Sequence, residues 1–188
     1  VDGIWYGTGP LGVGVSVASA FALGEKLKDS DKKVFGLLGD GEAQEGQVYE
    51  MMEFSKHFNL NNLILFVDYN QVQLTASLHD TMNIDIRKIF EAGGWHTIEV
   101  DGHNYSDIWS ALGEAYQIKD CPVILIGHTI MGQGSHLMEP AGEEYRPDWH
   151  GKAPKAEDID IDMEKLTLTQ EEENLLEHFR QNFVKWKP

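Results

Sequence analysis

The chain has 188 residues, of which 41% are hydrophobic and 24% charged, so it is long enough for one domain with a sizeable core. Its formal net charge of −16 argues against a nucleic acid or an anionic membrane surface as a partner, and an anionic ligand would need a metal ion, helix N-termini or backbone amides to hold it. The single cysteine, Cys121, excludes an internal disulfide, and no signal peptide or 18-residue apolar stretch can be recognised, so we expect a cytoplasmic protein.

Apolar patterns predict that helices and strands alternate along most of the chain. A helix over 13–27, rich in Ala and Val, follows a glycine-rich turn and precedes a short apolar strand over 33–38. In the next helix, 45–57, apolar residues recur at helical spacing, and the basic residues Lys56 and His57 come last, as the helix dipole favours.

The strand over 62–70 is apolar throughout, which is typical of a strand covered on both faces of a sheet. The remaining predicted elements are a helix over 84–92, a strand over 95–100, a helix over 106–118 and a strand over 122–130. Strands that alternate with helices in this way predict an α/β fold, with a parallel sheet flanked by helices and right-handed crossovers.

The character of the sequence changes after residue 130. Residues 131–154 contain glycines and prolines without periodicity and are expected to form a long loop, and the acidic stretch 156–165 is expected to be solvated. A tail helix is predicted from Thr169, with Glu172 completing a capping box. The predicted division is a domain over 1–158, followed by an acidic linker and C-terminal helix over 159–188.

One glycine motif is misleading. Residues 7–12 satisfy G-x-G-x-x-G literally, but the dinucleotide fingerprint needs a strand before it and an acid at the end of a second strand. Asp31 has roughly the required spacing, yet it precedes the strand over 33–38 instead of following it. A nicotinamide or flavin site is therefore disfavoured, and a phosphate-approach loop of another kind stays open.

A second glycine motif places an acid at a strand end. Asp40 lies between Gly39 and Gly41 after the strand over 33–38, and Asn70 follows the next strand, 30 residues on, which fits one βαβ unit. Right-handed crossover puts both side chains at the carboxyl edge of the sheet, where open α/β folds bind ligands. The alternative is that both are turn residues at strand ends.

The oxygen atoms at this edge favour a hard cation. One carboxylate, one amide oxygen and a nearby backbone carbonyl, such as that of Val72, suit Mg²⁺, or Ca²⁺ in its place, and such an ion often shares its ligands with phosphates. An EF-hand is excluded, because Glu45 stands where the loop starting at Asp40 would need glycine.

Five motifs in order resemble the transketolase family, over about residues 3–158. They are "TGPLGVG" (8–14), "GDGEAQEG" (39–46), "FVDYNQVQL" (66–74), "DGHN" (101–104) and "WHGKAP" (149–154). The resemblance is to the thiamine diphosphate-binding N-terminal domain of the family, and is closest to the N-terminal subunit of two-subunit transketolases. It implies a thiamine diphosphate-binding fold.

The resemblance also implies roles for the residues around Asp40. Asp40, Asn70 and the Val72 carbonyl would bind the metal that bridges the cofactor diphosphate. Gly39 and Gly41 would line the cofactor, and Gly41 would let the backbone approach the diphosphate.

Further positions match the family's cofactor and catalytic residues. Gly9 and Leu11 match loop positions near the aminopyrimidine and thiazolium rings, and Leu74 matches an apolar residue that packs against a ring. His150 matches a histidine beside the diphosphate and the substrate-bearing carbon. Glu45 matches an acid at the dimer interface that connects paired active sites, although by itself it reads as a first-turn helix acid.

The chain departs from the family pattern in several places. Relatives carry a segment ahead of the first motif, and Val1–Gly3 is expected to be internal to a longer protein. Thr75-Ala76 replaces a common Asp-Gly, Met131 replaces a basic residue of some relatives, and the loop over 135–148 is longer. The glutamate that activates the aminopyrimidine lies in the family's pyrimidine-binding domain, so a partner domain or subunit is expected.

These features together predict a transketolase-like transferase. It would move a two-carbon ketol unit between sugar phosphates with thiamine diphosphate and Mg²⁺, and would be inactive without its pyrimidine-binding partner. Two alternatives remain: another thiamine diphosphate enzyme, of the 2-oxo acid dehydrogenase or deoxyxylulose phosphate synthase type, or a non-catalytic cofactor-binding or assembly module.

Self-association is also expected, through the helix that follows Glu45. Its apolar residues Val48, Met51, Met52 and Phe54 exceed what one core face needs, and large apolar patches are seldom left open. Two-fold pairing would place Glu45 at or near the interface of a homodimer.

Overall fold

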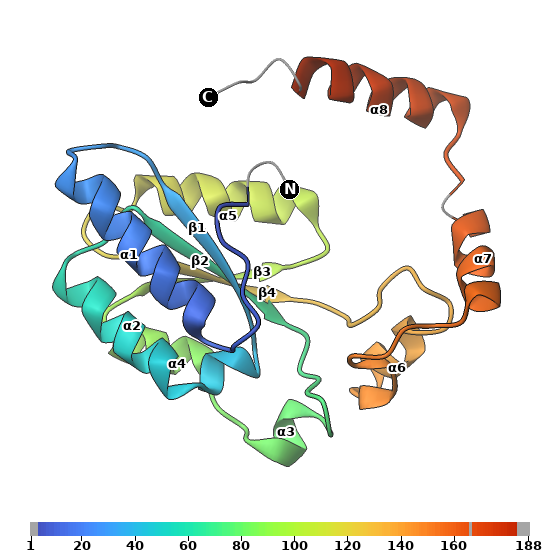
Figure 1. Cartoon of the computed structure of the whole chain (residues 1–188), viewed down its shortest axis with the longest axis horizontal. Coiled ribbons are helices and arrows are strands. Elements are labelled where there is room, and N and C mark those ends of the chain that lie inside the picture. The colour runs from blue at the N-terminus through green and yellow to red at the C-terminus, as the bar shows by residue number, and fades with distance from the viewer. Residues whose placement is uncertain (1–3, 166, 184–188) are drawn as a thin grey trace.

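The computed structural model describes residues 4–165 and 167–183, in which a four-stranded parallel sheet forms the centre (Figure 1). The expectation for Val1–Gly3 lies outside these residues. The strands, in the spatial order β1-β2-β4-β3, are β1 (Val34–Gly39), β2 (Leu63–Tyr69), β4 (Val123–His128) and β3 (His96–Asp101). The predicted α/β fold with a parallel sheet is confirmed.

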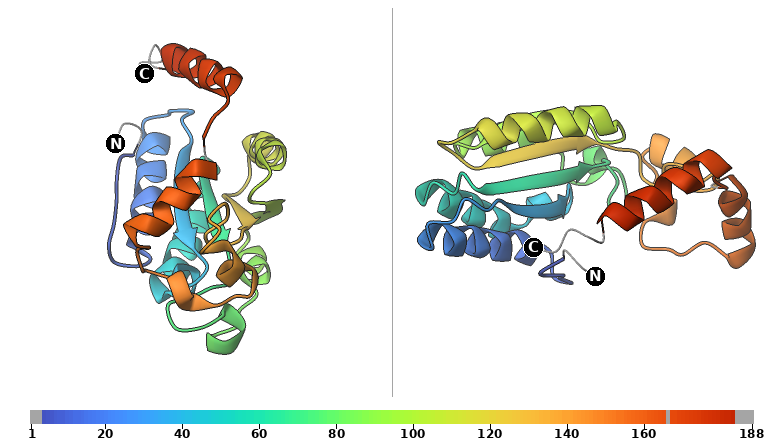
Figure 2. Two further views of the ribbon diagram at one scale, coloured as in Figure 1. Left: turned by 90° about the vertical axis from the view of Figure 1, so that its right-hand side faces the viewer. Right: turned by 90° about the horizontal axis from the view of Figure 1, so that it is seen from above.

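Helices cover both faces of the sheet, which Figure 2 shows as layers in its right-hand view. One face carries α1 (Val13–Leu27), α2 (Gly46–His57) and α4 (Ile86–Ala92), and the other carries α5 (Tyr105–Gln117). The remaining helices are α3 (Leu78–Thr81), α6 (Glu139–Glu143), α7 (Ala156–Lys165), α8 (Gln170–Phe183) and the 3₁₀ turns η1 (Glu42–Gln44) and η2 (Pro147–Trp149).

β2 is apolar along nearly its whole length because helices cover both faces of the sheet. Leu63 and Leu65 pack on the side of α1, α2 and α4, whereas Ile64 packs on the side of α5. All three are at most 1% exposed. A strand with both faces buried needs apolar residues at every position, so alternation is lost.

The apolar side of α2 is buried within the domain, contrary to the expectation of surplus apolar surface. Val48, Met51 and Met52 are at most 7% exposed and belong to the core, while Phe54 is 37% exposed. The expectation of surplus apolar surface is wrong for Val48, Met51 and Met52, because they belong to the core that α2 shares with α1 and the sheet, and self-association stays a prediction.

The region after β4 contains more helix than the sequence predicted. The short helix α6 and the turn η2 interrupt the expected loop, and α7 occupies the stretch predicted to be a solvated linker, crossing the proposed boundary at residue 158. Five residues are too few to show a helical period, and α7 leaves Ile159 and Ile161 44% and 47% exposed, so it lacks a buried apolar stripe.

The tail helix α8 begins as predicted. The Glu172 carboxylate accepts a hydrogen bond from the Thr169 amide at 2.8 Å, and the Glu172 amide donates to the Thr169 hydroxyl at 3.3 Å, which completes a capping box. Figure 1 shows α8 standing apart from the sheet. Within the described part of the chain, no helix is both long and apolar enough to cross a bilayer.

Gly142→Ala is expected to destabilise the protein, because a Cβ atom there would overlap the backbone carbonyl oxygen of Met131. Backbone cannot yield as a flexible side chain does, so the free energy of unfolding should fall by roughly 1–3 kcal/mol. Gly113→Ala in α5 is the control. That position faces open space, and the change should stabilise the helix by up to about 1 kcal/mol. Urea unfolding measures the free energy of unfolding of both variants. Equal changes in the two variants would contradict the close approach of α6 to Met131.

Candidate functional site

Two loops meet at the carboxyl edge of the sheet. Asp40 follows β1 and Asn70 follows β2, and these strands are parallel neighbours with Gly39 opposite Asp68. The Asp40 carboxylate accepts a hydrogen bond from the Gln71 amide at 2.5 Å, which ties the first loop to the second. The predicted placement of both residues at one edge is confirmed.

Asp40 is a buried acid. The residue is only 3% exposed, and burial raises the pKa of its carboxyl group above the ordinary value. The backbone amides of Gln71 and Gly41 oppose that shift, Asp68 adds to it, and His150 lowers the pKa again. A cation at this carboxylate would compensate the cost of burying its charge.

The loop after β2 is strained where it meets Asp40. Gln71 has φ 61°, a left-handed conformation that is uncommon outside glycine, and its amide is the donor to Asp40. Such strain persists where surrounding contacts enforce it, and it concentrates at functional sites.

The carbonyl of Val72 faces the same side as Asn70. Residues 71–78 form a short antiparallel hairpin. In it the Leu78 amide donates to the Gln71 carbonyl, and the Gln73 amide donates to the Ala76 carbonyl. Val72 pairs with Ser77 between them, so its own amide and carbonyl point away from Ser77. The Val72 amide donates to the Asn70 Oδ1 at 2.9 Å, which places the carbonyl on the Asn70 side.

The resulting donor set contains three oxygens: the Asp40 carboxylate, the Asn70 Oδ1 and the Val72 carbonyl. Hard oxygen donors of this kind fit Mg²⁺ or Ca²⁺. Among the residues that the structure describes, no group of three or more His, Cys, Asp or Glu side chains is placed to hold a metal. A metal at this edge would therefore rely on neutral oxygens and on ligand phosphates for the rest of its coordination.

Two buried polar atoms beside this set have no hydrogen-bond partner within the described residues. They are the Gln73 Nε2 and the His150 Nδ1. The Gln73 side-chain amide lies 3.5 Å from the position that a Cβ atom on Gly41 would take. The Leu74 side chain lies 3.8 Å from the position that a Cβ atom on Gly151 would take. A buried polar group without a partner is costly, so a polar ligand that reaches these two atoms would satisfy them. The residues present therefore fit a metal-bound diphosphate.

Glu42 is a structural residue of the site that was not predicted from the sequence. Its carboxylate accepts hydrogen bonds from the Gly12 amide at 2.8 Å and the Gly39 amide at 3.3 Å. It therefore joins the "TGPLGVG" loop to the "GDGEAQEG" loop. Its position directly after Gly41 could have indicated this role, but the sequence analysis selected Glu45 instead.

The other predicted site residues lie around the rim. Leu11 and Leu74 are 56% and 69% exposed, and a Cβ atom at Gly9 would meet no neighbour within 4 Å among the described residues. Glu45 stands at the N-cap position of α2 without a side-chain capping hydrogen bond, is exposed, and lies beside Gly12. The structure thus brings Asp40, Asn70, Val72 and His150 to one edge and leaves the ring-contacting positions open.

The "DGHN" motif supports this edge from the neighbouring strands. His103 Nε2 accepts a hydrogen bond from the Ile130 amide at 2.7 Å, and the Asn104 side chain caps α5. A Cβ atom on Gly102 would lie 2.5 Å from Thr129, so only glycine fits between β3 and the loop after β4. These contacts give the motif a structural role.

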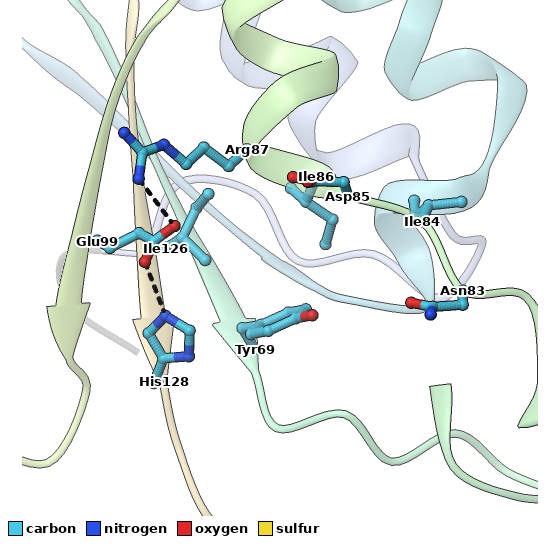
Figure 3. Close-up of a pocket in the computed structure, with 9 residues that line it drawn as sticks. All are labelled: Tyr69, Asn83, Ile84, Asp85, Ile86, Arg87, Glu99, Ile126 and His128. Carbon is cyan, nitrogen blue, oxygen red and sulfur yellow. Dashed lines mark hydrogen bonds and ion pairs between the residues drawn. The ribbon is translucent and has the colours of Figure 1, made fainter. Parts of the chain in front are cut away.

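Two cavities flank the edge. One has a volume of about 410 Å³. Figure 3 shows that Glu99 bonds there to both Arg87 and His128, so the Glu99 carboxylate and the Arg87 guanidinium compensate one another. The other, of about 620 Å³, is lined by Gln71 and by Tyr145, which also has a positive φ. Neither cavity is lined by Asp40 or His150. The donor set therefore lies outside both cavities.

A parallel α/β domain with polar groups at the carboxyl edge of its sheet belongs to the class of open α/β folds that bind ligands at that edge. Comparison with known proteins narrows this class. Residues 1–185 match the family described as the thiamine diphosphate binding domain of transketolase, and the chain belongs to this family.

Relatives and solved structures agree with this assignment. An apulose-4-phosphate transketolase subunit of Phocaeicola vulgatus is 33% identical over 158 residues, which cover 84% of this chain and 54% of that protein. Human transketolase is 38% identical over 77% of this chain and 22% of that protein. The crystal structure of Campylobacter jejuni transketolase matches with a TM-score of 0.66 and 28% identity, over 81% of this chain and 28% of that chain. The chain thus spans about half the length of the Phocaeicola relative and under a third of the other two.

Asp40→Asn is expected to change the pH dependence of folding. Because the pKa of Asp40 is raised, the folded chain without metal holds this proton more tightly than the unfolded chain. The free energy of unfolding should therefore fall as pH rises from the ordinary value of 3.8 through the folded pKa. Asparagine keeps an acceptor for Gln71 but removes the charge, so the variant should be more stable at pH 7, by on the order of 1 kcal/mol.

Urea unfolding of both proteins at several pH values, with chelator present, measures this difference. The same pH dependence in wild type and Asp40→Asn would show that this carboxylate is not a buried charge in the folded chain.

Proposed function

We propose that this chain is the diphosphate-binding half of a transketolase-type enzyme that transfers a two-carbon ketol unit between sugar phosphates. The observation that carries the proposal is the joining of the Asp40 and Asn70 loops through the Gln71 amide, with unpartnered Gln73 and His150 atoms beside them among the described residues. Family membership supports the choice of thiamine diphosphate over other diphosphates.

The chain's own residues would anchor the cofactor. Asp40, Asn70 and the Val72 carbonyl would hold Mg²⁺, and the metal would let a chain of net charge −16 bind an anionic diphosphate. Gly41 would let its backbone approach the diphosphate, and the Gln73 Nε2 would donate to a diphosphate oxygen. When bound, thiamine diphosphate supplies the electron sink and carrier for the two-carbon unit.

His150 would act at the boundary between cofactor and sugar. Its electrostatic interaction with Asp40 supports a position near the carboxylate that we assign to the metal, and its Nδ1 is buried without a partner among the described residues. A histidine so placed can donate to a phosphate oxygen or move a proton to or from a substrate oxygen.

A partner would complete the site. The rim residues Leu11 and Leu74 are exposed, and the carboxylate that would activate the aminopyrimidine belongs to a pyrimidine-binding domain or subunit. The relatives named as subunits of apulose-4-phosphate transketolase support an arrangement of two kinds of subunit. The chain alone should then bind the cofactor weakly and show no turnover.

Thiamine diphosphate and Mg²⁺ titrations, followed by a ketol-transfer assay, test this function in the presence of a pyrimidine-domain subunit. Asp40→Ala should weaken metal-dependent binding by roughly 100-fold or more. His150→Ala should lower kcat by roughly 100-fold with little effect on folding. His96→Ala is the matched control, because His96 begins β3 at the opposite edge of the sheet.

The outcomes separate the alternatives. Unchanged affinity in Asp40→Ala would remove the proposed metal site. Tight binding without turnover would identify a cofactor-binding module, and turnover of a 2-oxo acid in place of a ketose phosphate would identify another thiamine diphosphate enzyme.

We also propose that two copies pair through α2, with Glu45 at the interface. Although most apolar side chains of α2 are buried, Phe54 and Phe58 remain 37% and 41% exposed at its end, with ring centroids 4.7 Å apart. An exposed aromatic pair is a suitable centre for an interface.

Phe54→Lys should weaken dimerisation at least about 10-fold by placing a charge in that interface. Trp109→Lys is the control, since Trp109 is 78% exposed on α5, across the sheet. Light scattering over a range of concentrations measures both, and a wild-type monomer at every concentration would contradict the pairing.

A further inference from the structure

Helix α7 contacts the loop after β4, which precedes it in the sequence. Its Asp162 carboxylate accepts a hydrogen bond from the Ser135 hydroxyl at 2.6 Å and one from the His136 amide at 2.9 Å. The same carboxylate also contacts the His136 Nδ1 at 2.5 Å. Three contacts thus join residues that are 26 and 27 positions apart.

Ser135 connects this carboxylate to the start of α6. The residue is 8% exposed, and its hydroxyl oxygen also accepts hydrogen bonds from the Leu137 and Met138 amides, at 3.3 and 3.2 Å. The hydroxyl donates to Asp162 and not to His136, so the three side chains do not form a nucleophile–base pair. Their arrangement joins two segments instead.

Few other contacts attach α7 to the domain. Ile159, Ile161 and Met163 are 44%, 47% and 58% exposed, so apolar burial contributes little. Between α7 and residues 4–154, within the described part of the chain, the Asp162 contacts are the only side-chain hydrogen bonds.

We propose that Asp162 is a positioning residue that closes the segment 135–162 and thereby holds His150 against the Asp40 edge. The segment contains α6, η2 and His150, and its two ends are joined by Asp162. Closing a loop removes most of the conformations open to the residues inside it. The inference rests on the proposed function only for the role of His150 in turnover.

The carboxylate is ionised across the working pH range. Hydrogen bonds from the side chains of Ser135 and His136, and from the His136 amide, lower the pKa of Asp162 to about 2. The stabilising effect is therefore complete above the ordinary aspartate value of 3.8 and is lost as the pH falls through about 2.

Hydrogen exchange of the full chain tests the closure directly, because it needs neither cofactor nor partner. Asp162→Ala should increase exchange at residues 135–138 and 147–151 at least about 10-fold, and leave β2 and β4 unchanged. Asp160→Ala is the matched control, since Asp160 is exposed on the same helix. Unchanged exchange at 147–151 in Asp162→Ala would overturn the proposal.

Turnover with the pyrimidine-domain subunit tests the consequence. Asp162→Ala should lower kcat and leave the KM for the sugar phosphate nearly unchanged, and Asp162→Glu should recover part of the loss. The double variant Asp162→Ala, His150→Ala should be no slower than His150→Ala alone, because both act through one group.

Fully additive losses would overturn the link to His150. If wild type shows no ketol transfer, the proposed function fails, and exchange at 147–151 alone decides whether Asp162 holds the segment.

Discussion

The hydrogen bond from the Gln71 amide to the Asp40 carboxylate is the contact on which the site depends. It joins the loop after β1 to the loop after β2, and its donor, Gln71, has a left-handed conformation. With Gln71 fixed, its own carbonyl receives the Leu78 amide, and Val72 is turned towards Asn70. One buried carboxylate therefore orders the three oxygens that we assign to a metal ion.

The same edge collects contacts from distant parts of the chain. Glu42 joins the loop that opens α1 to the loop after β1, and His103 joins the end of β3 to the segment after β4. A parallel sheet favours this concentration, because every strand delivers its following loop to one edge. The edge is polar and open, while the core below it is apolar and closed.

Much of the fold could be predicted because buried helices and strands have recognisable patterns of apolar residues. The uninterrupted apolar run of β2 and the small residues of α1 each indicate the surface that the element packs against. Asp40 and Asn70 could be placed at one edge from the direction of crossover alone. Contacts between segments leave no such pattern. Glu42 and Gln73 belong to no repeating pattern, α6 is one turn long, and among the described residues the side-chain hydrogen bonds from α7 to residues 4–154 all come from Asp162.

The strand order β1-β2-β4-β3 has a consequence for how the chain can fold during synthesis. β1 and β2 are adjacent both along the chain and in the sheet, so the two strands that carry the Asp40–Gln71 contact are both made before β3 and β4. β3 pairs only with β4, which is made later, and must wait for α5 and β4 to leave the ribosome. The segment that carries His150 comes last. During synthesis, the oxygens that we assign to a metal ion therefore leave the ribosome before the residue that would work beside them.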